Sequence, residues 1–348
     1  MGNRVISIIE NSKVTHPLAL EASSGGKYWK DFQIATQDFE RVLTEKEFDK
    51  LLEKSQLDQK INLNQYLQFS TEFTVVDYII RNYYNFKYEP QYNGKKNPEC
   101  SFEYEGRTIN VEVKCPDLSK RIKQETSEGI NLYTSDRFPT KDAYSQAIEI
   151  VKSSIKDGVY IQPIDRLDNK LKDYLTSAHG KFPDSSISNF NVLVIAVEII
   201  PDMDEWYSYL FGTNGAFTDS PYITEDYSNV DAVLITNVQA GHKAFNVDKN
   251  INKWMLENYI SLLFLNPQKE NLYELGNYYI NKAINLFGGL TRSFLQFQLA
   301  LDEKNQARDN NIDKTIRLTS RRRELNYLSD KIIDLQIISE WVKTLKNQ

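Results

Sequence analysis

The sequence predicts an α/β protein in which a mixed central sheet is flanked by helices. The apolar run NVLVIAVEII at residues 191–200 is typical of a buried central strand, and a second such run, VDAVLITNV, begins at Val230. Segments with helical spacing of apolar residues lie before and between these runs, and residues 86–115 have the character of short strands. Helices and strands that alternate along the chain indicate an α/β core.

The N-terminal part, residues 1–62, predicts a mixed and helical segment. Its clearest helix is EKEFDKLLEKSQL, which follows Thr44 and carries apolar residues at helical spacing. We predict no chemistry for this segment. A longer helix is expected at residues 63–85, where apolar residues follow a 3.6-residue period and Glu72 lies at the edge of the apolar stripe.

Three strands are expected at residues 86–92, 100–104 and 108–115, because the turn-forming pairs Asn93-Gly94 and Glu105-Gly106 separate them. Together they predict an antiparallel meander. After the meander, residues 119–140 are polar and irregular, so we expect a long loop that closes over a substrate. Helices are expected at 141–156 and 165–178, before the buried strand at 191–200.

Beyond Pro267 the sequence becomes helical, and the last predicted helix has an apolar stripe with spacings of three and four residues. Such a stripe is typical of a helix packed on its own domain, and it also suits an accessory lobe or a dimer face. The sequence therefore divides into an N-terminal segment (1–62), an α/β core (63–267) and a helical C-terminal region (268–348).

Composition excludes several classes of protein. The 348 residues contain no apolar run of the length of a membrane-spanning helix and no secretory signal, so we expect a cytoplasmic protein that does not enter a membrane. Two cysteines and three scattered histidines do not form a zinc site or a disulfide framework. A formal net charge of −6 argues against a protein that coats nucleic acid nonspecifically, but it does not exclude a nuclease.

The predicted hairpin at residues 98–114 has two unlike faces. In its second strand Glu112 and Lys114 point to one side while Val111 and Val113 point to the other, and Glu99 lies on the polar side of the first strand. The hairpin therefore gathers acidic and basic side chains on a single face.

A turn centred on Glu105-Gly106 sets the register of the hairpin. It places Cys100 opposite Val111, and one step further it places Glu99 opposite Glu112. Two carboxylates that face each other at a Cβ distance of about 5 Å repel, so a cation should lie between them. Mg²⁺ or Mn²⁺ suits this position, and Lys114 would reach the same site.

These residues resemble a known family. Pro98-Glu99, followed after twelve residues by Glu112-Val113-Lys114, is similar to the motif of the PD-(D/E)xK superfamily, the restriction-endonuclease-like nucleases. By position, Glu99 corresponds to the first acid, with Glu in place of the usual Asp, Glu112 corresponds to the second acid, and Lys114 corresponds to the lysine. The resemblance covers the middle of the chain, and it implies that residues 63–267 form a restriction-endonuclease-like core.

The family often has a further acid on the helix before the hairpin, and Glu72 is the residue that corresponds to it here. The resemblance thus implies a metal site of Glu72, Glu99 and Glu112, with Lys114 as a further catalytic residue. Some relatives have a polar active-site residue where Lys181 falls. The implied activity is Mg²⁺- or Mn²⁺-dependent hydrolysis of DNA phosphodiesters, with DNA the commoner substrate than RNA, in a restriction or anti-phage defence endonuclease. A homodimer or a regulatory protein partner would fit this role.

Three other interpretations are open. The first is a scaffold that keeps the nuclease fold and binds nucleic acid or protein without turnover. The second is a glycosidase with Glu99 and Glu112 as its carboxylate pair, although the neighbouring lysine would keep both acids ionised. In the third, Glu112 and Lys114 form an exposed ion pair on an edge strand, while Glu99 pairs with Lys95 or Lys96.

Overall fold

The structure is a computed structural model. It describes residues 16–56, 61–92, 96–125, 130–132, 141–154, 161–164, 166–186, 188–212, 214–218 and 226–266. The predicted C-terminal helical region, 268–348, lies outside the described residues.

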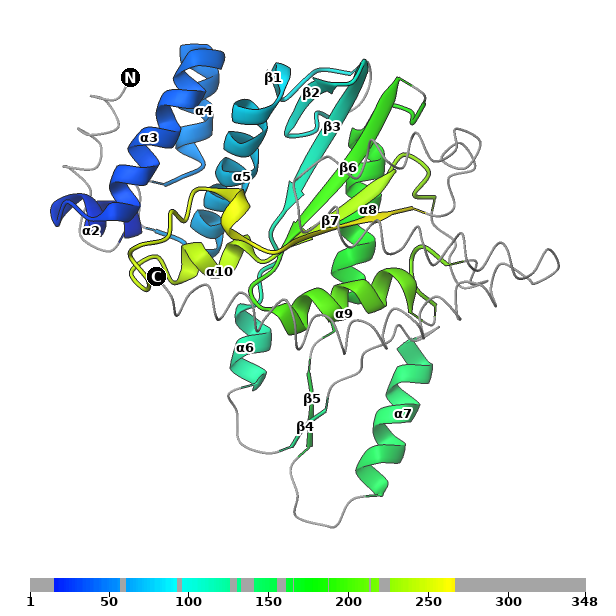
Figure 1. The fold of residues 1–348 in the computed structure, drawn as a ribbon. Helices are drawn as coiled ribbons and strands as arrows, with labels where there is room; N and C mark the ends of the chain where they lie inside the picture. Colours follow the sequence, from blue (N-terminus) through cyan, green and yellow to red (C-terminus); the bar gives the residue numbers. More distant parts are fainter. Residues whose placement is uncertain are drawn as a thin grey trace, which may run out of the picture.

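The centre of the structure is a mixed six-stranded sheet flanked by helices, as predicted (Figure 1). The first three strands form an antiparallel meander, the fourth pairs in parallel with the third, the fifth pairs in parallel with the fourth, and the final strand is antiparallel to the fifth. In spatial order the strands are β1 (Tyr84–Tyr88), β2 (Cys100–Tyr104), β3 (Arg107–Lys114), β6 (Asn189–Ala196), β7 (Ala232–Thr236) and β8 (Ser261–Leu265).

The β2–β3 hairpin has the predicted register. Tyr104 pairs with Arg107 and Cys100 pairs with Val111. The turn residues Glu105 and Gly106 have φ angles of 49° and 79°, as expected for a two-residue turn whose twist matches that of the strands.

Strand β1 begins and ends earlier than the predicted strand at 86–92. It ends at Tyr88 because Glu89 adopts a left-handed conformation, with φ of 42°. The backbone N–H of Glu89 nevertheless donates to the carbonyl oxygen of Glu99 at 2.9 Å, so the chain stays beside the start of β2. This contact brings the Glu89 side chain close to that of Glu99.

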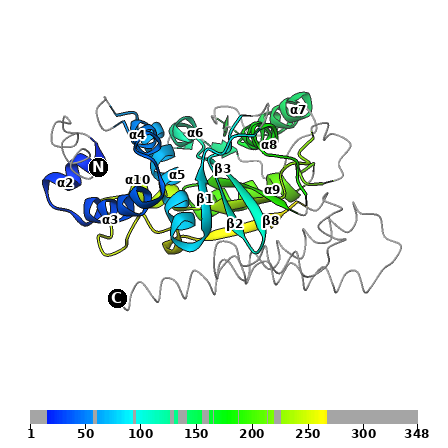
Figure 2. The same ribbon diagram turned by 90° about the horizontal axis from the view of Figure 1, so that it is seen from above.

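Helices cover both faces of the sheet because strand residues alternate between two hydrophobic cores. Val194 lies in the core that α5 (Leu63–Asn82) covers, and its neighbour Leu193 lies in the core that α8 (Asp168–Lys181) and α9 (Ile200–Phe211) cover. Figures 1 and 2 show α5 on one side of the molecule and α8 and α9 toward the other. The predicted helices at 63–85 and 165–178 correspond to α5 and α8.

Three N-terminal helices, α2 (Pro17–Ser23), α3 (Lys27–Val42) and α4 (Glu45–Glu53), extend the core on the α5 side. Helix α4 is the predicted helix after Thr44. A capping box starts it, since the Thr44 side chain accepts from the Glu47 N–H while the Glu47 carboxylate accepts from the Thr44 N–H. Lys54, which caps the other end of α4, contributes to the site described below.

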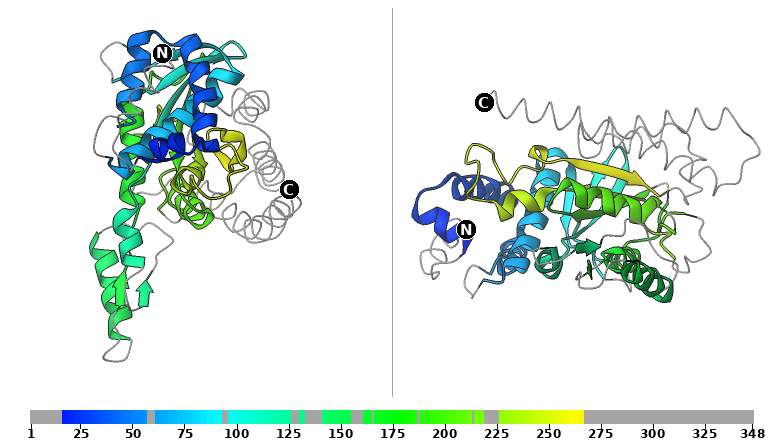
Figure 3. Two further views of the ribbon diagram at one scale, coloured as in Figure 1. Left: turned by 90° about the vertical axis from the view of Figure 1, so that its left-hand side faces the viewer. Right: turned by 90° about the horizontal axis from the view of Figure 1, so that it is seen from below.

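The prediction of a long loop at 119–140 is wrong in part. The structure places α6 (Ser119–Glu125) and β4 (Ile130–Leu132) in this segment. Strand β4 pairs in parallel with β5 (Ile161–Pro163), and with α7 (Lys141–Ser153) they project from the main body as an arm (Figure 3).

Helix α6 was missed because its sequence signal is small. Within α6, Ile122 packs on a core that also contains Leu118, the residue before the helix. The Asp117 carboxylate accepts from the Ser119 N–H at 2.9 Å and so satisfies one of the free N–H groups at the helix start.

Helix α10 (Val238–Lys243) and a 3-10 turn (Leu256–Asn258) complete the described elements. The fully buried His242 ring hydrogen-bonds to the hydroxyls of Tyr28 and Thr74, both at 2.8 Å, and therefore joins α10 to α3 and α5. His242 is thus a core residue whose two ring nitrogens both have hydrogen-bond partners. Within the described part of the chain, no helix combines the length and apolarity needed to cross a bilayer.

We predict that Phe73→Ala on α5 lowers the free energy of unfolding by about 3–5 kcal/mol, as expected for a large cavity. Phe73 is fully buried and contacts the rings of Phe39, Phe32 and Trp254 at centroid distances of 4.2, 5.0 and 5.3 Å. Urea denaturation would measure the loss. Leu63→Ala on the same helix is the control, because Leu63 is 49% exposed, and an equal loss for both variants would contradict the packing argument.

Candidate active site

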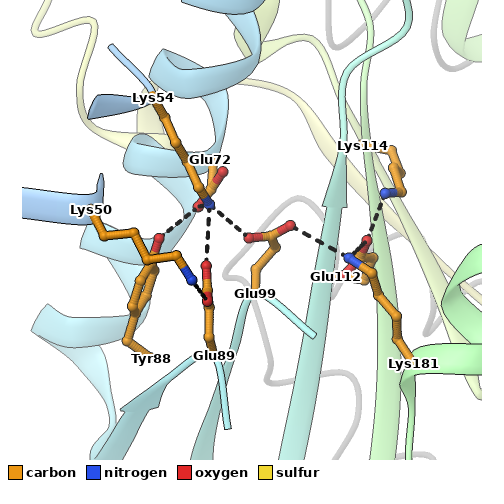
Figure 4. A network of polar contacts seen from close by, with 9 residues as sticks. All are labelled: Lys50, Lys54, Glu72, Tyr88, Glu89, Glu99, Glu112, Lys114 and Lys181. Atoms are coloured by element: carbon orange, nitrogen blue, oxygen red, sulfur yellow. Dashed lines mark hydrogen bonds and ion pairs between the residues drawn. The ribbon is translucent and has the colours of Figure 1, made fainter. Parts of the chain in front are cut away.

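The four predicted site residues lie in one network of carboxylates and lysines (Figure 4). Some of its side chains come from α5, from β3, from α8 and from the residue before β2. The others come from the end of α4 and from the end of β1. Its members are Lys50, Lys54, Glu72, Tyr88, Glu89, Glu99, Glu112, Lys114 and Lys181.

Glu112 is the centre of one half of the network. Its Oε1 lies 2.6 Å from the Nζ atom of Lys114 and 2.6 Å from that of Lys181. Lys114 comes from the same face of β3, as the strand period predicts, and Lys181 comes from the last turn of α8. The structure therefore brings Lys181 into direct contact with the predicted second acid.

The Glu112 side chain is 0% exposed, and its Oε2 has no hydrogen-bond partner among the described residues. Burial is the largest effect on its pKa; Lys114 opposes it and the charge of Glu99 adds to it, and the net pKa is raised. The interpretation of Glu112 and Lys114 as an exposed pair on an edge strand is wrong, because β3 is an internal strand between β2 and β6. A buried carboxylate oxygen without a partner is costly unless something else binds it.

Glu99 links the two halves of the network. Its Oε1 lies 3.8 Å from the Nζ atom of Lys181, on the side of Glu112, while its Oε2 lies 3.3 Å from the Nζ atom of Lys54. Glu99 directly precedes β2, so the observed register brings it beside Glu112 as predicted. The two acids are thus held together by a shared lysine.

The second half of the network is built around Lys54. Its Nζ atom lies 2.7 Å from Glu72 Oε1, 3.3 Å from Glu99 Oε2 and 3.6 Å from Glu89 Oε1. The hydroxyl of Tyr88 also donates to Glu72 Oε1, at 3.4 Å. Glu72, the acid predicted on the helix, therefore contacts Lys54 directly.

The sequence interpretation missed Lys54, Lys50 and Glu89. Lys50 and Lys54 are four residues apart, so they lie on the same side of α4, where such a pair usually marks a solvated helix face. The left-handed backbone of Glu89 places its side chain in the network, and no sequence pattern indicates that conformation. The position of α4 beside the sheet is the information that was lacking.

The pKa values of Glu72 and Glu99 are shifted in opposite directions by their surroundings. Burial, with the neighbouring charge of Glu99, raises the pKa of Glu72 to about 8. Burial acts in the same direction on Glu99, but Lys54 and Lys181 outweigh it and lower the pKa of that carboxyl. The two acids therefore differ in how readily they hold a proton.

Burial lowers the pKa of Lys54, but the carboxylates of Glu72 and Glu99 outweigh burial and raise it overall. Lys54 therefore stays a cation at neutral pH. A charged ammonium among carboxylates is the arrangement that keeps buried acids from destabilising the fold.

The acids of the network are possible ligands for a divalent cation. Within the described ranges, no group of three or more His, Cys, Asp and Glu side chains is arranged to hold a metal ion, because lysines lie among the carboxylates. Two features nevertheless fit Mg²⁺ or Mn²⁺. The donors of Glu99 and Glu112 are carboxylate oxygens, which these ions prefer, and the buried Oε2 of Glu112 lacks any described partner.

Comparisons with known proteins add no relatives. No protein-family model matches the chain, and searches of curated proteins and of solved structures found no match. The chemistry of the site is therefore inferred from its own residues and their geometry.

We predict that Glu72→Gln flattens the pH dependence of stability in EDTA. A carboxyl whose folded pKa is about 8, above the ordinary 4.5, binds a proton in the folded state that the unfolded chain releases, so its stabilising effect is lost as the pH rises through that range. One such proton accounts for at most about 1.4 kcal/mol per pH unit. Urea denaturation between pH 5 and 8 would measure the slope.

Glu53→Gln is the matched control, because Glu53 is an exposed carboxylate of the neighbouring helix α4. It should retain the wild-type slope. If Glu72→Gln has the same slope as the wild type, Glu72 does not hold a proton in the folded state.

Proposed function

We propose that this protein is a Mg²⁺- or Mn²⁺-dependent nuclease of the PD-(D/E)xK type. The observation that carries the proposal is the buried Glu112, whose Oε1 contacts Lys114 and Lys181 while its Oε2 has no described partner. Glu99 lies on the same side of the hairpin, 3.8 Å from Lys181. Two acids on adjacent strands with a lysine one pleat away form the arrangement expected for phosphodiester hydrolysis.

Glu99 and Glu112 would hold the cation. When bound, it supplies Lewis-acid stabilisation of a phosphate oxygen and lowers the pKa of a coordinated water. Glu112 is fixed by the strand pairs on both sides of β3, so its carboxylate is preorganised. Glu99 is kept beside Glu112 by Lys181, which contacts both acids.

Lys114 acts on the reacting groups, and Lys181 supports it through Glu112. Lys114 lies at the end of β3 and is partly exposed, so its ammonium can turn from Glu112 toward a phosphate or an attacking water. There it donates hydrogen bonds that orient the water and offset the negative charge that grows on the phosphate. Lys181 keeps Glu112 paired while Lys114 is engaged.

The substrate and biological role follow from the resemblance. DNA is the preferred substrate in the proposal because it is the commoner substrate of the superfamily, and the products would carry 5′-phosphates. A cytoplasmic restriction or anti-phage defence endonuclease fits a catalytic core with added helices. A second copy of the chain or a regulatory protein would be its partner.

A scaffold without turnover is the second candidate. The observation that favours it is the complete set of ion pairs, since lysines neutralise the acids without a metal ion. In this case nucleic acid would bind equally well in Mg²⁺ and in EDTA. Exchange of Lys114 would leave that binding unchanged.

We predict that the wild type cleaves DNA in Mg²⁺ or Mn²⁺ but not in EDTA, and that Lys114→Ala lowers the cleavage rate by about 10²- to 10⁴-fold, the usual contribution of a positioned acid–base group. Plasmid, linear and single-stranded DNA, with RNA alongside, would be digested and resolved on gels. Lys30→Ala is the control, because Lys30 is an exposed lysine of α3 outside the network.

Circular dichroism would show whether each variant is folded. If the folded wild type cleaves none of these substrates in any metal, or if Lys114→Ala cleaves as fast as the wild type, the proposed mechanism is wrong.

A further inference from the structure

Lys54 lies among three carboxylates, where its ammonium is the shared cation. Three carboxylates from separate parts of the chain, Glu72, Glu89 and Glu99, direct an oxygen to its Nζ atom, at 2.7, 3.6 and 3.3 Å (Figure 4). A single cation among several carboxylate oxygens is also the coordination pattern of Mg²⁺ and Ca²⁺, whose oxygen distances are about 2.0–2.6 Å. An ammonium group has three N–H donors, so Lys54 has one for each of the three acids.

Glu99 connects this position to the proposed catalytic pair. One of its oxygens lies toward Lys54 and the other toward Lys181 and Glu112. A carboxylate that is shared in this way is the usual bridge between the two ions of a two-metal phosphodiesterase. In this chain the cation on the far side of Glu99 is part of the protein.

We propose that Lys54 is a positioning residue whose ammonium takes the place of a second divalent cation. The inference rests on the proposed function, in which Glu99 and Glu112 hold one ion. In this arrangement Glu72 and Glu89 hold Lys54, and through Lys54 they fix the Glu99 carboxylate beside Glu112. Glu72 thus serves the site through Lys54 and is not itself a ligand of the ion.

The neighbouring lysine shows what a lysine outside this position does. Lys50, one turn earlier on α4, contacts Glu89 alone among the network members and is 58% exposed, whereas Lys54 is 32% exposed and contacts all three acids. Lys50→Ala is therefore a matched control. It removes an ammonium from the same helix and the same acid cluster but leaves the central position filled.

The experiment counts bound Mn²⁺ by equilibrium dialysis and electron paramagnetic resonance, without substrate. The Lys54→Ala variant removes the ammonium and leaves room, so it should bind one more ion than the wild type. The Lys50→Ala variant should bind the wild-type number. Adding Glu72→Gln to Lys54→Ala should remove the extra ion, because the new site loses an anionic ligand.

A folded Lys54→Ala protein that binds no additional ion would overturn the inference. If Lys54→Ala does not fold, Glu72→Gln in the wild-type background is the second test. It should keep the wild-type number of ions, and loss of an ion would show that Glu72 is a metal ligand and that Lys54 does not fill the position.

The two proposals fail in different ways. If the nuclease proposal is wrong, no substrate is cleaved and no bound ion depends on Glu112. The gain of one ion in Lys54→Ala is measured relative to the wild type and without cleavage, so it tests the role of Lys54 whether or not the protein is a nuclease.

Discussion

The burial of the Glu112 carboxylate is the constraint on which the rest of the site depends. Glu112 is on a strand that pairs on both sides, and water does not reach its side chain. A charged group in such a place is stable only when cations surround it. The strand itself supplies Lys114, and the helix that covers this face supplies Lys181. The packing of α8 on the sheet therefore also completes the site.

The same constraint extends outward through Glu99. Because Lys181 also lies near Glu99, the two acids share a cation, and the free side of Glu99 then needs Lys54. Lys54 in turn gathers Glu72 and Glu89. Each charge in the cluster is thus neutralised by the next, from the α4 side of the sheet to the α8 side.

The sequence predicted the parts of the site that local periodicity controls. The two-residue side-chain period and the Glu105-Gly106 turn were sufficient to derive the register of β2 and β3, and hence the proximity of Glu99 and Glu112. The central strands were recognisable because strands buried on both faces are apolar throughout.

Other parts depend on long-range packing, which one sequence does not encode in any simple pattern. Lys54 resembles any exposed lysine until α4 is placed beside α5, and α6 has too few apolar residues to be distinguished from a loop. The left-handed backbone of Glu89 ended β1 earlier than predicted, although Glu does not favour that conformation.

The network also has a consequence for the order of folding. Two of its lysines lie far apart in the sequence, Lys54 before α5 and Lys181 at the end of α8, with the hairpin between them. Contacts between residues far apart in sequence form late, because a long stretch of chain must first be ordered. A chain still emerging from the ribosome, in which α8 has not been made, has Glu112 without Lys181. The cluster is therefore complete only after α8 has been made and packed on the sheet.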